Sequence, residues 1–402
     1  MIKNSGADFI IDRLEKAGFQ AFYVGGCVRN YLLGITVNDY DITTNARPNY
    51  VCEIFKDCSY FTSGIKHGTV SVVVEGNVYE ITTFRTKEKY TDYRHPTSLV
   101  FCDDIHEDLS RRDFTINAIA YNKNTGIIDD FNGIYDLQNS ILRSVNEPKV
   151  RFKEDALRIL RGMRFCSTYN LSPEQNTKNE MINCSKYLTK IASERILSEL
   201  EVIILGDNVY SVLSDFKEVL FTVIPQLNKC ESKNFDLLPY FKAISNCSKS
   251  FIARFSIMLL PCKDDALGVL NALKFDGKTK RVILQILSTL SIDCNYDKIE
   301  IKKLIRNFKI NTVDFIEVYA AKQIILGNSV DKIELLKLYD EIILNNECCM
   351  LSQLKVNGND LIELGFYGVE IKDKLEKVLN LIIEEKLLNE KSVIIEYLKN
   401  YG

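Results

Sequence analysis

The spacing of apolar residues changes once along this chain, close to residue 140, and this change most limits what the chain can fold into. Before it, short apolar and β-branched runs such as AFYV alternate with short helical patterns. Two such runs in GTVSVVVEGNVYEITTFR flank Glu75-Gly76-Asn77, which predicts a hairpin. From Val150 onward, segments such as KLEKVLNLIIEEKLL have helical periodicity, and strand patterns become rare. We therefore expect an α+β fold whose second part is all-α.

The length and composition are those of a soluble globular protein. With 402 residues, 46% hydrophobic and 26% charged, the chain can form two to four structural units. No run approaches the roughly 18 apolar residues of a membrane span, and the N-terminus reads as an amphipathic helix rather than a signal peptide. The 12 cysteines are scattered without a C-x-x-C pair. We expect free buried thiols and a cytoplasmic location, and no structural zinc site.

The stretch YVGGCVRNYLLGITVNDYDITT combines glycines with charged residues. Read as strand, helix and strand, it places Asp39 and Asp41 on one face of the second strand, because side chains alternate. Two neighbouring carboxylates repel each other, and divalent cations between them stabilise both charges. Gly25 and Gly26 let the backbone approach a phosphate, and Arg29 adds positive charge. The alternative is a tight turn beside a solvated acidic strand end, because D-x-D alone is a weak signal.

The stretch EDLSRRDFTINAIAYN is a second candidate. Arg111 and Arg112 stand where a helix is expected to begin, before an apolar run. An arginine there can bind a triphosphate through paired hydrogen bonds. Taken alone, the pattern fits a capped helix with a surface ion pair to Asp108 or Asp113 better.

The stretch RFKEDALRILRGMRF reads as one helix with several charges. Asp155 and Arg158 are neighbours at a spacing of three residues, as are Arg158 and Arg161, while Arg164 lies about half a turn from Asp155. An aspartate beside an arginine offers an acceptor and donors that can read the edge of a nucleobase. The simpler alternative is a salt-bridged surface helix.

In this order, the motifs resemble those of class II tRNA nucleotidyltransferases, the CCA-adding enzyme family, of the Gram-positive bacterial type. GGCVRN…NDYDITT is similar to the metal-binding motif, RRDFTINAIAYN to the second motif and DDFNGIYDL to the third. EDALRILR is similar to the nucleotide-recognising helix, and IASERI to a further helix-start motif. The resemblance reaches VNGNDLIELG near the C-terminus. The chain departs from the family at GVEIKDKL, where relatives often have G-P-x-I-G.

The resemblance implies an α+β architecture. It consists of an N-terminal nucleotidyltransferase (polymerase-beta-like) head with a small mixed sheet, followed by all-α neck, body and tail domains. The expected boundaries are 1–140 for the head, 141–205 for the neck, 206–290 for the body and 291–402 for the tRNA-binding tail. The nucleobase-recognition helix belongs to the neck.

The resemblance also implies an activity, the template-independent addition of CCA to the 3′ end of tRNA from CTP and ATP. The tRNA 3′-hydroxyl would attack the α-phosphate with the help of two Mg²⁺ ions, and pyrophosphate would leave. Asp39 and Asp41 would hold Mg²⁺, and Arg112 would complete the catalytic set. The nucleotide-binding residues would be Gly26, Arg29, Arg112, Asp155, Arg158, Arg161 and Arg164. Within that set, Asp155 and Arg158 would read the base, and Glu80 is left open as a third carboxylate.

The expected partners are CTP, ATP and tRNA, held at its acceptor stem and elbow; no membrane partner is expected, and a homodimer is left open. The polar loop 87–98 contains YTDYRHP, which by resemblance favours CCA or A addition over CC addition. Two basic patches are candidates for RNA binding, although each alone fits a solvated helix face better. They are Lys278, Lys280 and Arg281, and Lys298, Lys302, Lys303, Arg306 and Lys309.

Two kinds of alternative activity remain at this stage. An A-adding tRNA nucleotidyltransferase or a poly(A) polymerase would share the catalytic head, although TSGIKHGTVSVVV has the form typical of tRNA-directed members. A non-catalytic RNA-binding protein would be favoured if either Asp39 or Asp41 were missing, and both are present.

Overall fold

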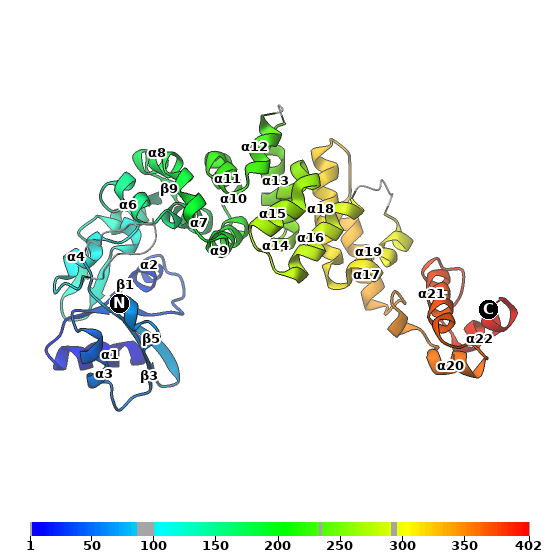
Figure 1. Cartoon of the computed structure of the whole chain (residues 1–402), viewed down its shortest axis with the longest axis horizontal. Coiled ribbons are helices and arrows are strands. Elements are labelled where there is room, and N and C mark those ends of the chain that lie inside the picture. The colour runs from blue at the N-terminus through cyan, green and yellow to red at the C-terminus, as the bar shows by residue number, and fades with distance from the viewer. Residues whose placement is uncertain (1, 87–99, 233–234, 291–295, 402) are drawn as a thin grey trace. The chain divides into compact units, whose positions relative to one another are not determined.

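The structure is a computed structural model (Figure 1), and it describes residues 2–86, 100–232, 235–290 and 296–401. The chain divides into two compact units, Met1–Ser232 with Ala272–Lys274 and Lys233–Asn271 with Phe275–Gly402. The polar loop 87–98 lies outside the described residues. The division into head, neck, body and tail at the boundaries given above stays a prediction.

The first unit contains a mixed sheet of 7 strands in the order β3-β4-β5-β2-β1-β6-β7. The strands are β1 (Ala21–Val24), β2 (Asp41–Thr44), β3 (Tyr60–Phe61), β4 (Thr69–Val74), β5 (Asn77–Thr83), β6 (Ala120–Asn122) and β7 (Gly126–Ile128). Strands β2 and β5 are parallel, and the other neighbours are antiparallel. A separate parallel pair is formed by β8 (Ile141–Leu142) and β9 (Ser172–Pro173). The predicted hairpin and the small mixed sheet are confirmed.

In the first unit, helices alternate with the strands up to about residue 142, and the rest of the unit is almost entirely helical. The helices are α1 (Ser5–Lys16), α2 (Gly26–Leu32), α3 (Pro48–Ile54), α4 (Ile105–Ser110), α5 (Gly133–Gln138), α6 (Pro148–Glu154), α7 (Leu157–Tyr169), α8 (Gln175–Asn183), α9 (Ser193–Leu205), α10 (Val209–Asp215), α11 (Lys217–Val223) and α12 (Pro225–Glu231). Short 3₁₀ turns are η1 (Ile65–His67), η2 (Thr115–Asn117) and η3 (Ser185–Lys190). The amphipathic N-terminal helix is α1, which Asn4 caps by accepting from the Ala7 backbone at 2.9 Å.

The described residues of the second unit form helices joined by turns and loops, with no strand among them. Its helices are α13 (Leu238–Asn246), α14 (Phe251–Leu259), α15 (Ala266–Ala272), α16 (Gly277–Thr289), α17 (Lys298–Phe308), α18 (Thr312–Ile325), α19 (Lys332–Leu344), α20 (Gly358–Glu363), α21 (Val369–Ile383) and α22 (Lys391–Tyr401). The 3₁₀ turns are η4 (Leu260–Asp265), η5 (Lys309–Asn311) and η6 (Leu351–Gln353). Nowhere in the described ranges does a helix have both the length and the apolar character needed to cross a membrane.

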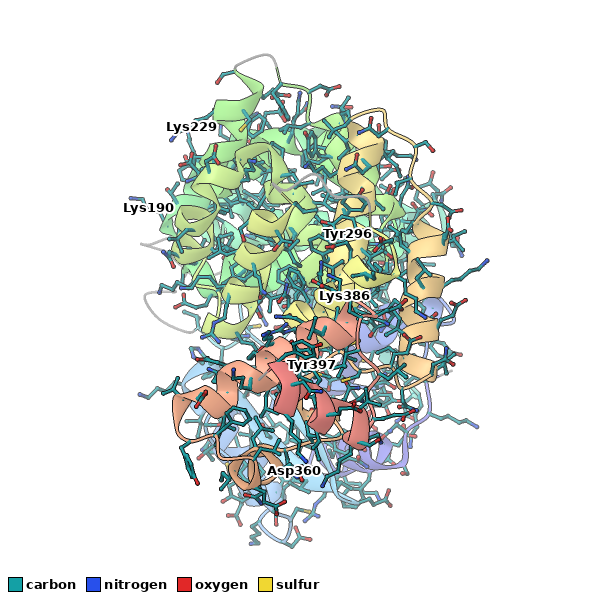
Figure 2. All side chains as sticks on the ribbon, turned by 90° about the vertical axis from the view of Figure 1, so that its right-hand side faces the viewer. Lys190, Lys229, Tyr296, Asp360, Lys386 and Tyr397 are labelled. Carbon is teal, nitrogen blue, oxygen red and sulfur yellow. The ribbon has the colours of Figure 1, made fainter. Side chains whose placement is uncertain are left out.

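The C-terminal helices α20, α21 and α22 share a small core of their own. Leu361, Val378, Leu379 and Ile394 are buried in it. Figure 2 labels Asp360 on α20 and Tyr397 on α22, and Lys391 at the start of α22 pairs with Asp360 at 2.5 Å. This ion pair connects the start of α22 to α20.

The two predicted basic patches differ in their charge balance. On α16, Lys278 and Arg281 are exposed, and Lys280 donates to Asn271. In the second patch, the four cations on α17 have glutamate partners, and Lys309 lies in the following turn η5. Lys298 and Lys302 share Glu347 at 2.7 and 2.8 Å, Lys303 contacts Glu300, and Arg306 contacts Glu376. The α17 patch therefore fits a solvated helix face, whose positive charges are neutralised by glutamates, better than an RNA-binding surface.

Gly206 marks a close approach between α9 and α7, the helix that carries the predicted nucleotide-binding residues Arg158, Arg161 and Arg164. A Cβ on Gly206 would lie 2.6 Å from the carbonyl oxygen of Ser167. We expect Gly206→Ala to lower the free energy of unfolding by about 1–3 kcal/mol, because α7 and α9 would have to move apart. Urea denaturation measures this change.

Gly268→Ala in α15 is the control, since nothing lies within 4 Å of its Cβ position. Alanine is more favourable than glycine inside a helix by about 0.5–1 kcal/mol, so this variant is expected to be neutral or stabilised. Equal destabilisation of both variants would contradict the close packing at Gly206.

Candidate active site

One cavity of the first unit, about 610 Å³ in volume, collects the predicted site residues. Every one of them except Asp39 lines it. One wall comes from the β1–α2 turn, the start of β2 and the segment after α4, and the other comes from α7 and α9. The lining also includes Gly25, Arg111 and Asp113, which the motifs contain, and residues that the sequence did not single out, namely Asn117, Phe165, Thr168, Tyr169 and Arg195.

The glycine turn between β1 and α2 leaves space at the floor of the cavity. Gly25 has a φ of 66°, in the region that favours glycine. A Cβ at this position would lie 3.1 Å from the Arg112 Nη1 atom and 3.8 Å from the Asp41 Oδ2 atom. The absence of a side chain at Gly25 thus keeps open the space between a carboxylate and a guanidinium.

Asp41 is a largely buried carboxylate beside two other acidic residues. Burial raises the pKa of the Asp41 carboxyl, the charges of Asp39 and Glu80 raise it further, and Arg112 opposes them. Glu80 is the register partner of Asp41 on β5.

Among the described residues, no lysine or arginine forms an ion pair with Asp41. In the same part of the chain, no group of three or more acidic, histidine or cysteine side chains is arranged to hold a metal. The carboxylates of Asp41 and Asp39 supply oxygen atoms, the ligand type that divalent cations such as Mg²⁺ prefer.

The expectation that Asp39 and Asp41 lie on one strand is wrong. Strand β2 begins at Asp41, so Asp39 lies before it. The pairing of β1 with β2 stops where Tyr23 faces Ile42, because Gly25 turns the chain into α2 just beyond. Asp39 pairs with none of the strands in the described part of the chain, but its charge still acts on Asp41.

The expected helix start at Arg111 and Arg112 is also wrong. Both residues follow α4, which begins earlier because Asp104 caps it by accepting from the His106 backbone at 2.9 Å. Asp108, fully buried in α4, accepts from Arg111 Nη2 at 2.7 Å and from Arg112 Nη2 at 3.1 Å. Burial raises the pKa of Asp108, but the two guanidinium groups outweigh burial and hold the pKa below its ordinary value.

Asp155 does not lie on a helix with Arg158, contrary to the prediction. Its extended backbone separates α6 from α7, and its side chain accepts from the Leu157 backbone N–H at 3.0 Å. Aspartate favours such breaks because its carboxylate competes for backbone donors. Asp155 forms a long ion pair with Arg195 at 3.5 Å, whereas Arg158 pairs with Glu154 at 2.9 Å.

Successive turns of α7 present arginines to the cavity. Arg161 pairs with Asp113 at 2.7 Å and Arg164 with Glu199 at 3.3 Å. Burial raises the pKa of Asp113, but Arg161 and the Asn117 amide outweigh burial and place the pKa well below its ordinary range. The pairing holds α7 against the segment that follows α4.

Arg29 differs from the other arginines of the cavity. Its side chain is 7% exposed, and burial lowers its pKa. Its guanidinium donates to Asn117 at 2.6 Å and to the Tyr169 hydroxyl at 2.9 Å. Within the described part of the chain, no carboxylate forms an ion pair with Arg29, so its positive charge remains available to an anion.

Replacing Asp108 tests how much its ion pairs with Arg111 and Arg112 contribute to the stability of the protein. Asparagine has the same shape but cannot neutralise two guanidinium groups, so Asp108→Asn should lower the free energy of unfolding at neutral pH by about 3–5 kcal/mol. The folded-state pKa of Asp108 is depressed, so its stabilisation is complete above the unfolded value and is lost as the pH falls. Urea denaturation should show the difference between wild type and variant shrinking below about pH 4.

The control is Asp57→Asn, which removes an exposed ion pair with Arg13. We expect little change in its stability at any of these pH values, because solvent screens an exposed pair. A pH-independent effect of Asp108→Asn would show that Asp108 stabilises the protein by packing and not by its charge.

The comparisons with known proteins agree with this geometry. Residues 21–143 match the family model of the poly A polymerase head domain, and residues 246–398 match that of tRNA nucleotidyltransferase domain 2. A CCA-adding enzyme of Ligilactobacillus salivarius is 34% identical, over 97% of this chain and 95% of that protein. One of Lactobacillus helveticus is 33% identical, over 97% and 96%.

A solved structure, the Bacillus stearothermophilus CCA-adding enzyme in complex with CTP, is similar along its whole length. Its TM-score is 0.81 at 28% identity, over 99% of this chain and 98% of that chain. The motif resemblance and the α+β architecture are confirmed. The chain belongs to the CCA-adding enzyme family.

Proposed function

We propose that this chain adds CCA to the 3′ end of tRNA from CTP and ATP, without a nucleic-acid template. One observation carries the proposal beyond the family likeness. Among the residues that the structure describes, the buried Arg29 has no carboxylate partner, and Asp41, in the same cavity, has no cationic partner. A triphosphate with its divalent cation supplies the charges that both groups need.

Two further donor atoms of the cavity residues support the proposal that a polyanion binds there. The Nε atom of Arg112 and the Nη1 atom of Arg195 are buried and have no hydrogen-bond partner in the described residues. Buried donors are normally satisfied, so a ligand acceptor at these positions would complete both side chains. We assign the phosphates of the nucleotide to Arg29 and Arg112.

Asp39 and Asp41 are proposed to hold Mg²⁺, which fits their oxygen donors and their mutual repulsion. Mg²⁺ bound there would activate the 3′-hydroxyl and neutralise the phosphates. In the transfer step, the 3′-oxygen of tRNA bonds to the α-phosphorus and the bond to the pyrophosphate oxygen breaks. Arg29 and Arg112 hold the phosphates in line, and Gly25 with Gly26 lets them approach the backbone.

Base selection is assigned to the break between α6 and α7. Asp155 has carboxylate oxygens to accept from an amino group, and Arg158 has donors for ring acceptors of cytosine or adenine. Arg158 is held by Glu154 and by the carbonyl oxygens of Arg151 and Arg111, which limits its rotation. Arg161 and Arg164, also held by carboxylates, support this wall.

The remaining assignments are also proposals. The helical remainder would hold the tRNA acceptor stem and elbow, and the exposed cations of α16 are better candidates than the paired ones of α17. We place the enzyme in the cytoplasm. A homodimer stays a prediction, as does a catalytic role of Glu80.

Asp41→Ala tests the metal site. We expect it to abolish nucleotide incorporation into tRNA that lacks its 3′ end, by at least about a thousandfold, because charge stabilisation at the transferred phosphate is lost. tRNA binding, measured by gel shift, should change little. Asp264→Ala, at an exposed site of the second unit, is the control. Incorporation at the wild-type rate by Asp41→Ala would contradict the assignment.

Arg158→Ala tests base reading. A good paired contact to a base is worth about 1–3 kcal/mol, so selectivity for CTP and ATP over UTP and GTP should fall roughly tenfold. Affinity for the triphosphate group itself should change less, because Arg29 and Arg112 remain. Competition assays with all four nucleotides measure this ratio, and unchanged selectivity would place base reading elsewhere.

A further inference from the structure

Tyr169, the last residue of α7, contacts Arg29 of α2 in two ways. Its hydroxyl accepts from Arg29 Nη2 at 2.9 Å and donates to the Asn30 Oδ1 atom at 3.3 Å. The guanidinium carbon of Arg29 also lies 4.6 Å from the centre of the Tyr169 ring and 5.2 Å from that of Phe165. Tyr169 thus fixes both the direction and the plane of a buried guanidinium.

The other side of Arg29 is held by a chain of hydrogen bonds. Arg29 Nη1 donates to Asn117 Oδ1 at 2.6 Å, and Asn117 Nδ2 donates to Asp113 Oδ1 at 3.0 Å. Asp113 Oδ2 in turn accepts from Arg161 Nε at 2.8 Å. The chain therefore starts on α7 at Tyr169, passes through Arg29 and returns to α7 at Arg161.

Among the described residues, the acceptors that contact Arg29 are neutral: the side-chain oxygens of Asn30 and Asn117 and the Tyr169 hydroxyl. Neutral acceptors fix the orientation of a guanidinium without cancelling its charge. A carboxylate in the place of Tyr169 would form an ion pair, and an incoming phosphate would then have to displace it. A tyrosine avoids this competition while it still satisfies a buried donor.

We propose that Tyr169 is a positioning residue for nucleotide binding, which holds Arg29 in the orientation that receives the triphosphate. Tyr169 also connects this arginine to α7, the helix that begins beside Asp155 and contains Arg158. The inference rests on the proposed function, since it needs a nucleoside triphosphate in the cavity. Because CTP and ATP share their phosphates, Tyr169 should affect both nucleotides equally.

Tyr169→Phe tests the inference, because it removes the hydroxyl and keeps the ring. We expect the KM for CTP and the KM for ATP to rise together, by about three- to tenfold, the value of one hydrogen bond. The KM for tRNA, the selectivity against UTP and GTP, and the melting temperature should stay at wild-type values. Tyr135→Phe, at a 58% exposed tyrosine of α5, is the matched control and should behave as wild type.

A double-mutant cycle separates positioning from a general structural role. In an Arg29→Ala background, Tyr169→Phe should cause no further loss of kcat/KM for either nucleotide, because the group that it positions is gone. An equal loss in both backgrounds, or an unchanged KM in Tyr169→Phe alone, would overturn the inference. Failure of the wild type to incorporate CTP and ATP would overturn the proposed function instead.

Discussion

The ion pair between Asp113 and Arg161 is the contact on which the cavity depends. Asp113 follows α4 and Arg161 lies on α7, so the pair joins the wall near the sheet to the wall of helices. Asp113 is buried, and the attraction of Arg161 together with hydrogen bonds from the Asn117 amide and the Phe114 backbone N–H compensates for its lost hydration. The hydrogen bonds from Arg158 to the Arg111 carbonyl and from Arg29 to Tyr169 join the same two walls, and the Asp113–Arg161 pair is the charged contact among them.

Pairing divides the charged residues of the cavity into two classes. Arg111, Arg112 and Arg161 are held by buried carboxylates, which fix their positions. Arg29 and Asp41 lack an oppositely charged partner among the described residues. The paired arginines stabilise the structure of the site. Arg29 and Asp41 are available to bind a ligand that has a negative charge and carries a cation. This division explains how one cavity can be rich in charge and still be ready for substrate.

The fold class and most of the cavity residues could be predicted from the sequence. The change from alternating to helical periodicity predicts the fold class, because each period reflects which side chains face the core. The motifs predict which residues line the cavity, and all of them except Asp39 do. Their local conformations were harder to predict. Strand β2 begins only at Asp41, because its pairing with β1 reaches no further than Ile42, and Asp155 interrupts a helix that its neighbours would continue.

Tyr169 and Asp108 show what the sequence could not reveal. The contact of Tyr169 with Arg29 joins residues 140 positions apart, and no local pattern predicts such a pair. The sequence pattern predicts Asp108 only as one surface partner of the arginines, but it is fully buried and paired with two of them. Asn117 and Arg195 lie within recognised motifs, RRDFTINA and IASERI, so attention to every polar residue of those motifs would have found them.

The central claim is that one cavity adds C, C and A in order to tRNA. The most direct measurement is the length of the product when the purified chain is incubated with Mg²⁺ and tRNA that lacks its 3′ end. CTP alone should extend this tRNA by CC, ATP alone should not extend it, and both together should extend it by CCA and then stop. A long poly(A) ladder, or extension only of tRNA that already ends in CC, would contradict the claim.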